Sequence, residues 1–258
     1  MMEFFTLQDL EYFMLILVRI SAFVLVAPFF NMSNTPVRVK AGLSIFLAFL
    51  LFQVVDLKGI HYETEIEYGI IVIKEFLVGL LLGYFANICT AILNFAGQII
   101  DMEIGLSMIN LLDPVSRMQT TITGNFYMYL VMLMLIITNM HHYILIAFVE
   151  TYTIIPIGTV IFKPDMYLLM VKFMVDYFII GFRITLPIFA ASLLINIILG
   201  IMAKVAPAMN MFVIGMQLKI FVGLVVLFLT IGILPSVSDF IFGEMDKMMK
   251  LIIHSMAP

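Results

Sequence analysis

The stretch ITLPIFAASLLINIILGIMA, residues Ile184 to Ala203, has no Asp, Glu, Lys or Arg over 20 positions and is followed by KVAP, residues Lys204 to Pro207. A hydrocarbon layer roughly 30 Å thick needs about 20 apolar helical residues to cross it. Two more charge-free runs occupy Phe76 to Ile100, with 25 residues, and Met118 to Val149, with 32 residues. The sequence therefore predicts a polytopic integral membrane protein.

The composition supports the same class and indicates helices. Apolar residues make up 64% of the chain and charged residues only 12%, against roughly a quarter charged in soluble domains. The apolar runs are continuous, whereas strands of a membrane barrel alternate over ~10 residues. The net charge of −4 is spread over several segments without a charged tail, which gives no indication of nucleic-acid binding. We therefore expect an all-α fold.

The apolar runs and their flanking breakers predict a single membrane domain over residues 1–258, built of helical hairpins from about six to seven apolar helices. The predicted apolar helices run from Leu10 to Phe30, Ala41 to Val55, Tyr68 to Ile100, Ile122 to Thr138, Tyr143 to Ile161, Phe178 to Ala203 and Phe212 to Leu234. A more polar C-terminal helix is predicted from Val237 to His254. Most prolines, Pro187 included, are interpreted as lying at or near helix boundaries, where a missing N–H costs least.

Small and polar residues recur every four positions in two of these helices. Residues at this spacing share one helix face. A Gly-xxx-Gly pair on such a face lets another backbone approach closely. One predicted row is Glu75, Gly79, Gly83 and Asn87, and the other is Asn196, Gly200 and Lys204. Each row is consistent with a packing face or with the lining of a pore.

The segment Asp101 to Gln119, DMEIGLSMINLLDPVSRMQ, is the least regular part of the apolar half. Gly105 and Pro114 break the helix there, although most residues between them are apolar. An apolar loop on a surface is unfavourable, so we expect it to bury against helices or to close a cavity. As a hydrophobic stopper it would use Gly105, Leu106, Met108, Ile109, Leu111, Leu112, Asp113 and Pro114.

Ionisable residues in apolar spans must pair, reach the interface or face water, because each costs roughly 2.5 to 3.5 kcal/mol at a bilayer centre. Arg19, Lys204 and Lys219 have no local partner of opposite charge. Glu75 and Glu150 are candidates for a proton relay, which keeps a proton-coupled transporter of a small solute open as an alternative. The sequence shows no nucleophile, metal-ligand or phosphate-loop motif, so we expect neither an enzyme nor a cofactor.

Many small and breaker residues of this chain resemble, in order and spacing, the FliR-type family of flagellar and virulence type III export gates. No single motif carries the resemblance, which covers about Arg19 to Leu234. The matching residues are Arg19, Ala27-Pro28, Pro36 to Gly42, Glu75 with Gly79 and Gly83, Gly97-Gln98, Gly105 to Ser107, Asp113-Pro114, Pro156 to Gly158, Pro187, Asn196, Gly200 and Ala206 to Gly215.

This resemblance implies a non-enzymatic gate subunit in the bacterial inner membrane at the flagellar basal body. Its implied partners are FliP-type and FliQ-type subunits around a conduit, an FlhB-type subunit at the entrance, unfolded export substrates and membrane lipid. It also implies a pore plug in the segment Gly105 to Asp113, subunit packing along the two polar rows, and a hairpin turn at Pro207 and Asn210. An injectisome gate remains the alternative to a flagellar one.

Overall fold

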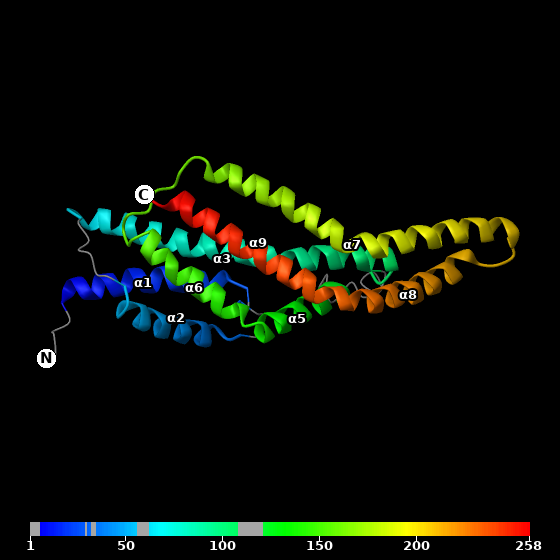
Figure 1. Ribbon diagram of the computed structural model, residues 1–258, viewed down its shortest axis with the longest axis horizontal. Helices are drawn as coiled ribbons and strands as arrows, with labels where there is room; N and C mark the ends of the chain where they lie inside the picture. Colours follow the sequence, from blue (N-terminus) through cyan, green and yellow to red (C-terminus); the bar gives the residue numbers. More distant parts are fainter. Residues whose placement is uncertain (1–5, 29, 32–34, 56–61, 108–120) are drawn as a thin grey trace. The chain divides into compact units, whose positions relative to one another are not determined.

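The computed structural model describes residues 6–28, 30–31, 35–55, 62–107 and 121–258, and its regular elements there are helices. The prediction of an all-α membrane protein is confirmed. The elements in Figure 1 are α1 (Leu7–Val26), α2 (Val37–Phe52), α3 (Glu65–Ile104), α5 (Ile122–Ile137), α6 (Met140–Ile154), α7 (Met166–Val205), α8 (Met211–Thr230), the short 3₁₀ helix η1 (Ile231–Ile233) and α9 (Leu234–Met256).

Several of these helices are long and apolar enough to cross a membrane. Three candidate spans lie in the described part of the chain, at Glu65–Ile104, Met166–Val205 and Met211–Met256. A fourth candidate joins α5 and α6, whose axes are bent by 76° at the intervening break. Asn139 lies in this break and has a left-handed backbone with φ of 57°. Asn tolerates this conformation better than most residues.

Two helix boundaries differ from the predicted ones for identifiable reasons. Helix α6 ends at Ile154 rather than Ile161, because Ile155 precedes Pro156 and is non-helical, with φ −121° and ψ 85°. A residue before proline is sterically disfavoured in the helical region. Helix α7 begins at Met166 rather than Phe178, so that Pro187 lies inside it and not at a boundary as predicted. Exposed Lys172 and half-buried Asp176 do not interrupt this helix.

The chain separates into two compact units. The first comprises Met1–Cys89, Asn139–Phe173 and Phe242–Pro258, and the second comprises Thr90–Thr138 and Met174–Ile241. The unit boundaries therefore fall within α3, α7 and α9. The single domain predicted over residues 1–258 remains a prediction.

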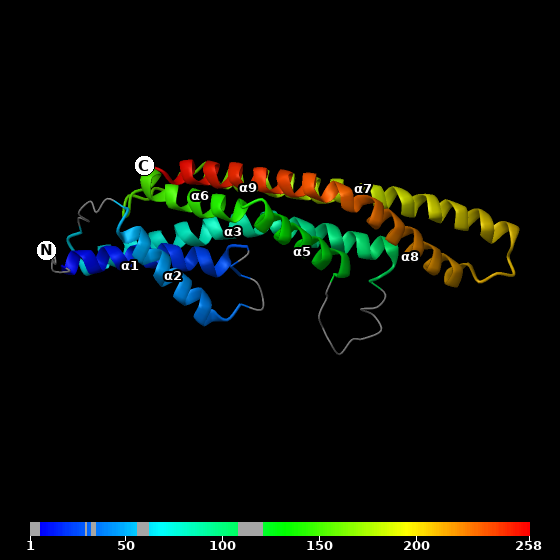
Figure 2. The ribbon, with the colours of Figure 1, turned by 60° about the horizontal axis from the view of Figure 1, so that its bottom comes forward.

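In the first unit, α1 and α2 form an antiparallel hairpin, visible in Figures 1 and 2. The inner face of α1 is fully buried, with Leu15, Ile16, Ile20 and Phe23 at most 1% exposed. The ring of Phe23 stacks on Phe148 of α6 with centroids 4.3 Å apart. This unit thus has an apolar core around α1.

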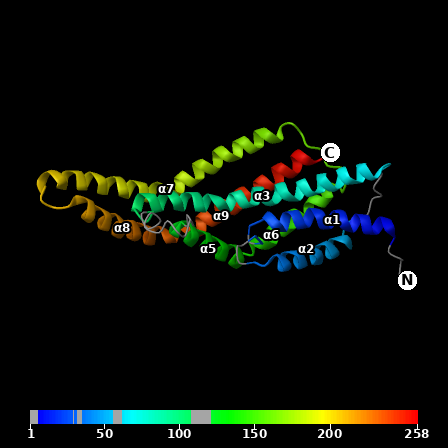
Figure 3. The same cartoon turned by 180° about the vertical axis from the view of Figure 1, so that it is seen from behind.

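In the second unit, α7 and α8 form another hairpin, seen at the left of Figure 3. The two helices approach closely, since a Cβ added at Gly215 of α8 would lie 2.8 Å from the Leu199 side chain of α7. Much of the hairpin surface is apolar and exposed, with Phe212, Phe221 and Phe228 each at least 67% exposed. Such a surface is typical of contact with lipid or with another protein.

Candidate functional site

The candidate site of the second unit is the junction between the end of α3 and the start of α5, on either side of the segment predicted as a plug. Asp101, in the last turn of α3, accepts hydrogen bonds from the backbone N–H groups of Ile122 at 2.7 Å and Thr123 at 3.2 Å, and from the Thr123 hydroxyl at 2.5 Å. These N–H groups belong to the first residues of α5, and the first N–H groups of a helix have no partner within the helix. The carboxylate therefore caps α5 and ties its start to the end of α3.

Close backbone contact strengthens this junction. A Cβ at Gly97 of α3 would overlap the backbone of Gly124 in α5, so glycine is required for the observed approach. The hydroxyl of Thr121 accepts the N–H of Gly124 at 2.8 Å and adds a second cap to α5. On the α3 side, the chain turns at Gly105, whose φ of 93° favours glycine. The residues on both sides of segment 108–120 are thus fixed to one another.

The predicted plug residues divide between described and undescribed parts of the chain. Gly105 and Leu106 lie in the turn after α3 and are half-buried. Met108, Ile109, Leu111, Leu112, Asp113 and Pro114 lie outside the described residues. The role of Asp101 at the α3–α5 junction was not predicted, because a single Asp near a helix end gives no information about a bonding partner 21 residues away.

The first unit contains a buried ion pair between Arg19 of α1 and Glu75 of α3. Both side chains are 0% exposed, and the Arg19 Nε donates to the Glu75 Oε2 at 2.5 Å. A second Arg19 nitrogen donates to the Ile155 carbonyl at 3.1 Å, and the Gly158 N–H donates to the Glu75 Oε1 at 2.9 Å. The guanidinium also lies over the Tyr152 ring, 4.5 Å from its centroid. The pair therefore connects α1, α3 and the segment after α6.

The row predicted from Glu75, Gly79 and Gly83 contacts α1 of the same chain. A Cβ at Gly79 would overlap the Arg19 carbonyl oxygen, and a Cβ at Gly83 would lie 2.9 Å from the Phe23 carbonyl oxygen. Asn87, the last member of the row, is half-buried. The close backbone approach expected from these glycines thus occurs within the first unit.

The second predicted row has different surroundings. Asn196, Gly200 and Lys204 are exposed on α7, and a Cβ added at Gly200 would meet nothing within 4 Å. Pro207 and Asn210 lie in the turn between α7 and α8, where the Asn210 side chain accepts the N–H groups of Phe212 and Val213. The row is therefore available for contacts outside the chain.

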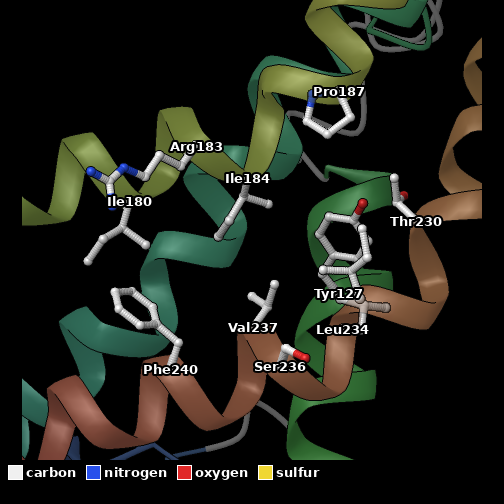
Figure 4. Close-up of a pocket in the computed structure, with 11 residues that line it drawn as sticks. Tyr127, Ile180, Arg183, Ile184, Pro187, Thr230, Leu234, Ser236, Val237 and Phe240 are labelled. Carbon is white, nitrogen blue, oxygen red and sulfur yellow. The ribbon is translucent and has the colours of Figure 1, made fainter.

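An apolar groove of about 310 Å³ lies in the second unit (Figure 4). Ile180 and Ile184 from α7 point toward Phe240 and Val237 from α9, and Tyr127 of α5 closes one side. Exposed Arg183 lies at the edge of the groove. Among the described residues, no group of three His, Cys, Asp or Glu side chains could hold a metal ion.

Comparison with known proteins identifies similar chains over most of this length. The family model described as bacterial export proteins, family 1, matches residues 10–245. A flagellar biosynthetic protein FliR of Bacillus subtilis is 31% identical over 234 residues, which cover 90% of each chain. Proteins of the same name from Escherichia coli and Aquifex aeolicus are 25% and 24% identical, over 93% and 98% of this chain and 92% and 96% of theirs.

Proposed function

This chain belongs to family 1 of the bacterial export proteins, and we infer from that membership that it is a non-enzymatic subunit of the flagellar type III protein export gate. The observation that carries the proposal is the similarity to FliR proteins along nearly the whole chain. Its apolar helices support a location in the membrane. We place it in the inner membrane at the flagellar basal body, where flagellar proteins leave the cell.

The proposed gate is a conduit assembled from several subunits. This chain would join FliP-type and FliQ-type subunits, with an FlhB-type subunit at the entrance, and unfolded flagellar proteins would pass through. The exposed row of Asn196, Gly200 and Lys204 supports a contact with a neighbouring subunit, because small residues allow close helix packing. No cofactor or nucleotide site is needed for this role.

Within the gate, we assign the segment from Gly105 to Pro114 the role of a plug. Two observations support this assignment: the segment is rich in apolar residues, and the residues flanking it are fixed by the Asp101 carboxylate and the Gly97–Gly124 contact. A stopper needs firmly held ends, since a loop with mobile ends could not return to the same place. Met108 adds an adaptable apolar side chain to such a seal.

The proposed function is tested first by deleting the gene and scoring motility and filament formation. We expect non-motile cells without filaments, and recovery when the intact gene is restored. The tagged chain should also purify with FliP-type and FliQ-type subunits. A deletion strain that swims normally, or a chain that purifies without gate partners, contradicts the proposal.

The plug assignment has its own test. Replacing Met108 to Leu112 by Gly and Ser should make the assembled gate conduct small ions, measured as current through gates in planar bilayers. The matched control replaces Glu63 and Thr64, in an exposed turn of the first unit, by Gly and Ser. An unchanged conductance would leave the segment with a packing role only.

A further inference from the structure

The second unit contains a long section of sequence without any acidic residue. Between Asp176 and Asp239 there is no Asp or Glu, but there are three cations, Arg183, Lys204 and Lys219. None of the three makes a hydrogen bond or an ion pair with any residue that the structure describes. Uncompensated cations in apolar helices are unfavourable, so each must find a partner, reach the interface or face water.

Lys219 differs from the other two cations in its position. Arg183 and Lys204 are exposed, and Lys204 lies in the last turn of α7, where a cation interacts favourably with the helix dipole. Lys219 is only half exposed and lies near the middle of α8, which contains no other charged residue. Lys219 is therefore the cation that most needs a partner.

Lys219 lines a cleft of about 300 Å³ formed by the end of α3 with α7 and α8. Leu199, Met211, Phe212, Gly215 and Met216 give the cleft an apolar wall, and Glu103, Ser107 and Asn196 contribute polar groups. The Glu103 carboxylate accepts the Ser192 hydroxyl at 2.9 Å and makes no ion pair with Lys219. The cleft thus combines apolar surface with a lysine ammonium that bonds to none of the described residues.

We propose that this cleft receives an apolar helix of another gate subunit, and that an Asp or Glu on that helix pairs with Lys219. The proposal rests on the proposed function, which supplies neighbouring subunits. Charge complementarity supports it, because the section between Asp176 and Asp239 carries three positive charges and no negative ones. The flexible Met211 and Met216 side chains suit an apolar surface that must adapt to a partner.

The position of Lys219 along α8 suits a carboxylate on a partner helix. At 1.5 Å per helical residue, Lys219 is about 12 Å from the start of α8 and about 17 Å from its end. An acidic residue on a helix that packs along α8 can lie at the level of Lys219. The exposed aromatic rings of α8 also leave a wide surface for such a helix.

Carbodiimide coupling tests the proposal in the purified gate complex. The reagent joins a lysine amine to a carboxylate in contact with it, with loss of water, and the joined peptides are identified by mass spectrometry. We expect Lys219 to be coupled to an Asp or Glu of another subunit. A coupling of Lys219 to Glu103 of its own chain, or no coupling of Lys219, overturns the proposal.

Substitutions give an independent measurement of the same contact. Lys219→Met should lower the fraction of the chain in the assembled gate by roughly tenfold or more, because it leaves the buried carboxylate of the partner helix without a counter-ion. Lys219→Arg should retain most of the assembly, and Lys172→Met is the control for an exposed cation outside the proposed contacts. Normal assembly of Lys219→Met contradicts the proposal. A lipid phosphate as the partner of Lys219 would make assembly of the unmodified chain, but not of Lys219→Met, depend on added lipids with anionic headgroups, and this result also contradicts it.

The outcomes also separate this proposal from the proposed function. If the unmodified chain enters the gate and supports motility but Lys219→Met does so equally well, only the docking of the cleft is wrong. If the unmodified chain does not associate with gate subunits, the proposed function itself is wrong.

Discussion

The buried cation of the first unit and the cations of the α7–α8 hairpin in the second unit differ in how their charges are met. In the first unit, the fully buried Arg19 is bound by Glu75 and by the Ile155 carbonyl, so its charge is compensated inside the chain. In the second unit, Lys219 and Lys204 make no ion pair or hydrogen bond with any described residue. The difference teaches that a fully buried cation is compensated inside the chain, whereas a half-exposed cation such as Lys219 can take its partner from outside it.

Helices α1 and α8 differ in the same way in how much of their apolar surface is buried. Leu15 and Ile16 of α1 are fully buried, whereas Phe221 and Phe228 of α8 are 67% and 73% exposed. Burial of a large apolar side chain contributes roughly 1.5 to 3 kcal/mol, which the exposed rings can gain only from surroundings outside the described chain. Helix α1 thus belongs to a core, whereas α8 presents a contact surface.

The largest effect is expected from breaking the buried pair of the first unit. Arg19→Met leaves the Glu75 carboxylate buried without its counter-ion and should destabilise the protein by about 3 to 5 kcal/mol. Lys204→Met, at an exposed cation of the second unit, should stay within about 0.5 kcal/mol. Unfolding of the isolated chain in detergent measures both, and equal effects would remove the contrast between the units.

A smaller effect is expected from filling the close contact between α1 and α3. Gly79→Ala places a methyl group against the Arg19 carbonyl and should cost about 1 to 3 kcal/mol through backbone displacement. Gly42→Ala is the control, because a Cβ there meets nothing within 4 Å and the helix gains up to about 1 kcal/mol. The same unfolding measurement distinguishes them, and a neutral Gly79→Ala would show that α1 is loosely packed.

Stability should depend less on the α3–α5 junction beside the predicted plug. Asp101→Ala removes the carboxylate that caps α5 and should cost about 0.5 to 2 kcal/mol, as for other helix caps. Asp101→Asn keeps one acceptor oxygen and should cost less. Hydrogen exchange at Ile122 and Thr123 would report the change, and unchanged exchange in Asp101→Ala would mean that Thr121 alone caps the helix.

The smallest effect concerns the start of α1. The Thr6 hydroxyl and N–H donate to Asp9 and lower the pKa of that carboxyl below its ordinary value of 3.8. A lowered folded pKa means that the contribution is fully present above 3.8 and is lost as pH falls through the folded pKa. Carboxyl NMR titration should show the Asp9 pKa rising in Thr6→Ala and staying low in Thr6→Ser. An unshifted pKa in Thr6→Ala would exclude the capping contact.

Local sequence signals predicted the helices well, because charge-free runs and breakers act over a few residues. The predicted segments Ile122 to Thr138 and Phe212 to Leu234 closely match α5 and α8. The predicted start of α7 at Phe178 was wrong, because the helix already includes the ionisable Lys172 and Asp176. Helix existence is a local property, whereas tolerance of a charge depends on what surrounds it.

Candidate site residues were recognised by type but their partners were not. The small-residue row at Glu75, Gly79 and Gly83 was identified from its spacing, yet its contact with Arg19 joins positions 56 residues apart. Asp101 was noted only as the first residue of the irregular segment Asp101 to Gln119, and its bonds to Ile122 and Thr123 were not predicted. No local pattern specifies such distant pairs.

The sequence by itself determined that the protein is a helical membrane protein, since apolar length and charge content set the solvent that each segment prefers. It also determined the family, through the order of small and breaker residues along the chain. Only the tertiary structure decided that Glu75 compensates Arg19, while Lys219 is left with a half-open cleft. Compensation of a charge depends on distance in space, and distance in space is fixed by packing.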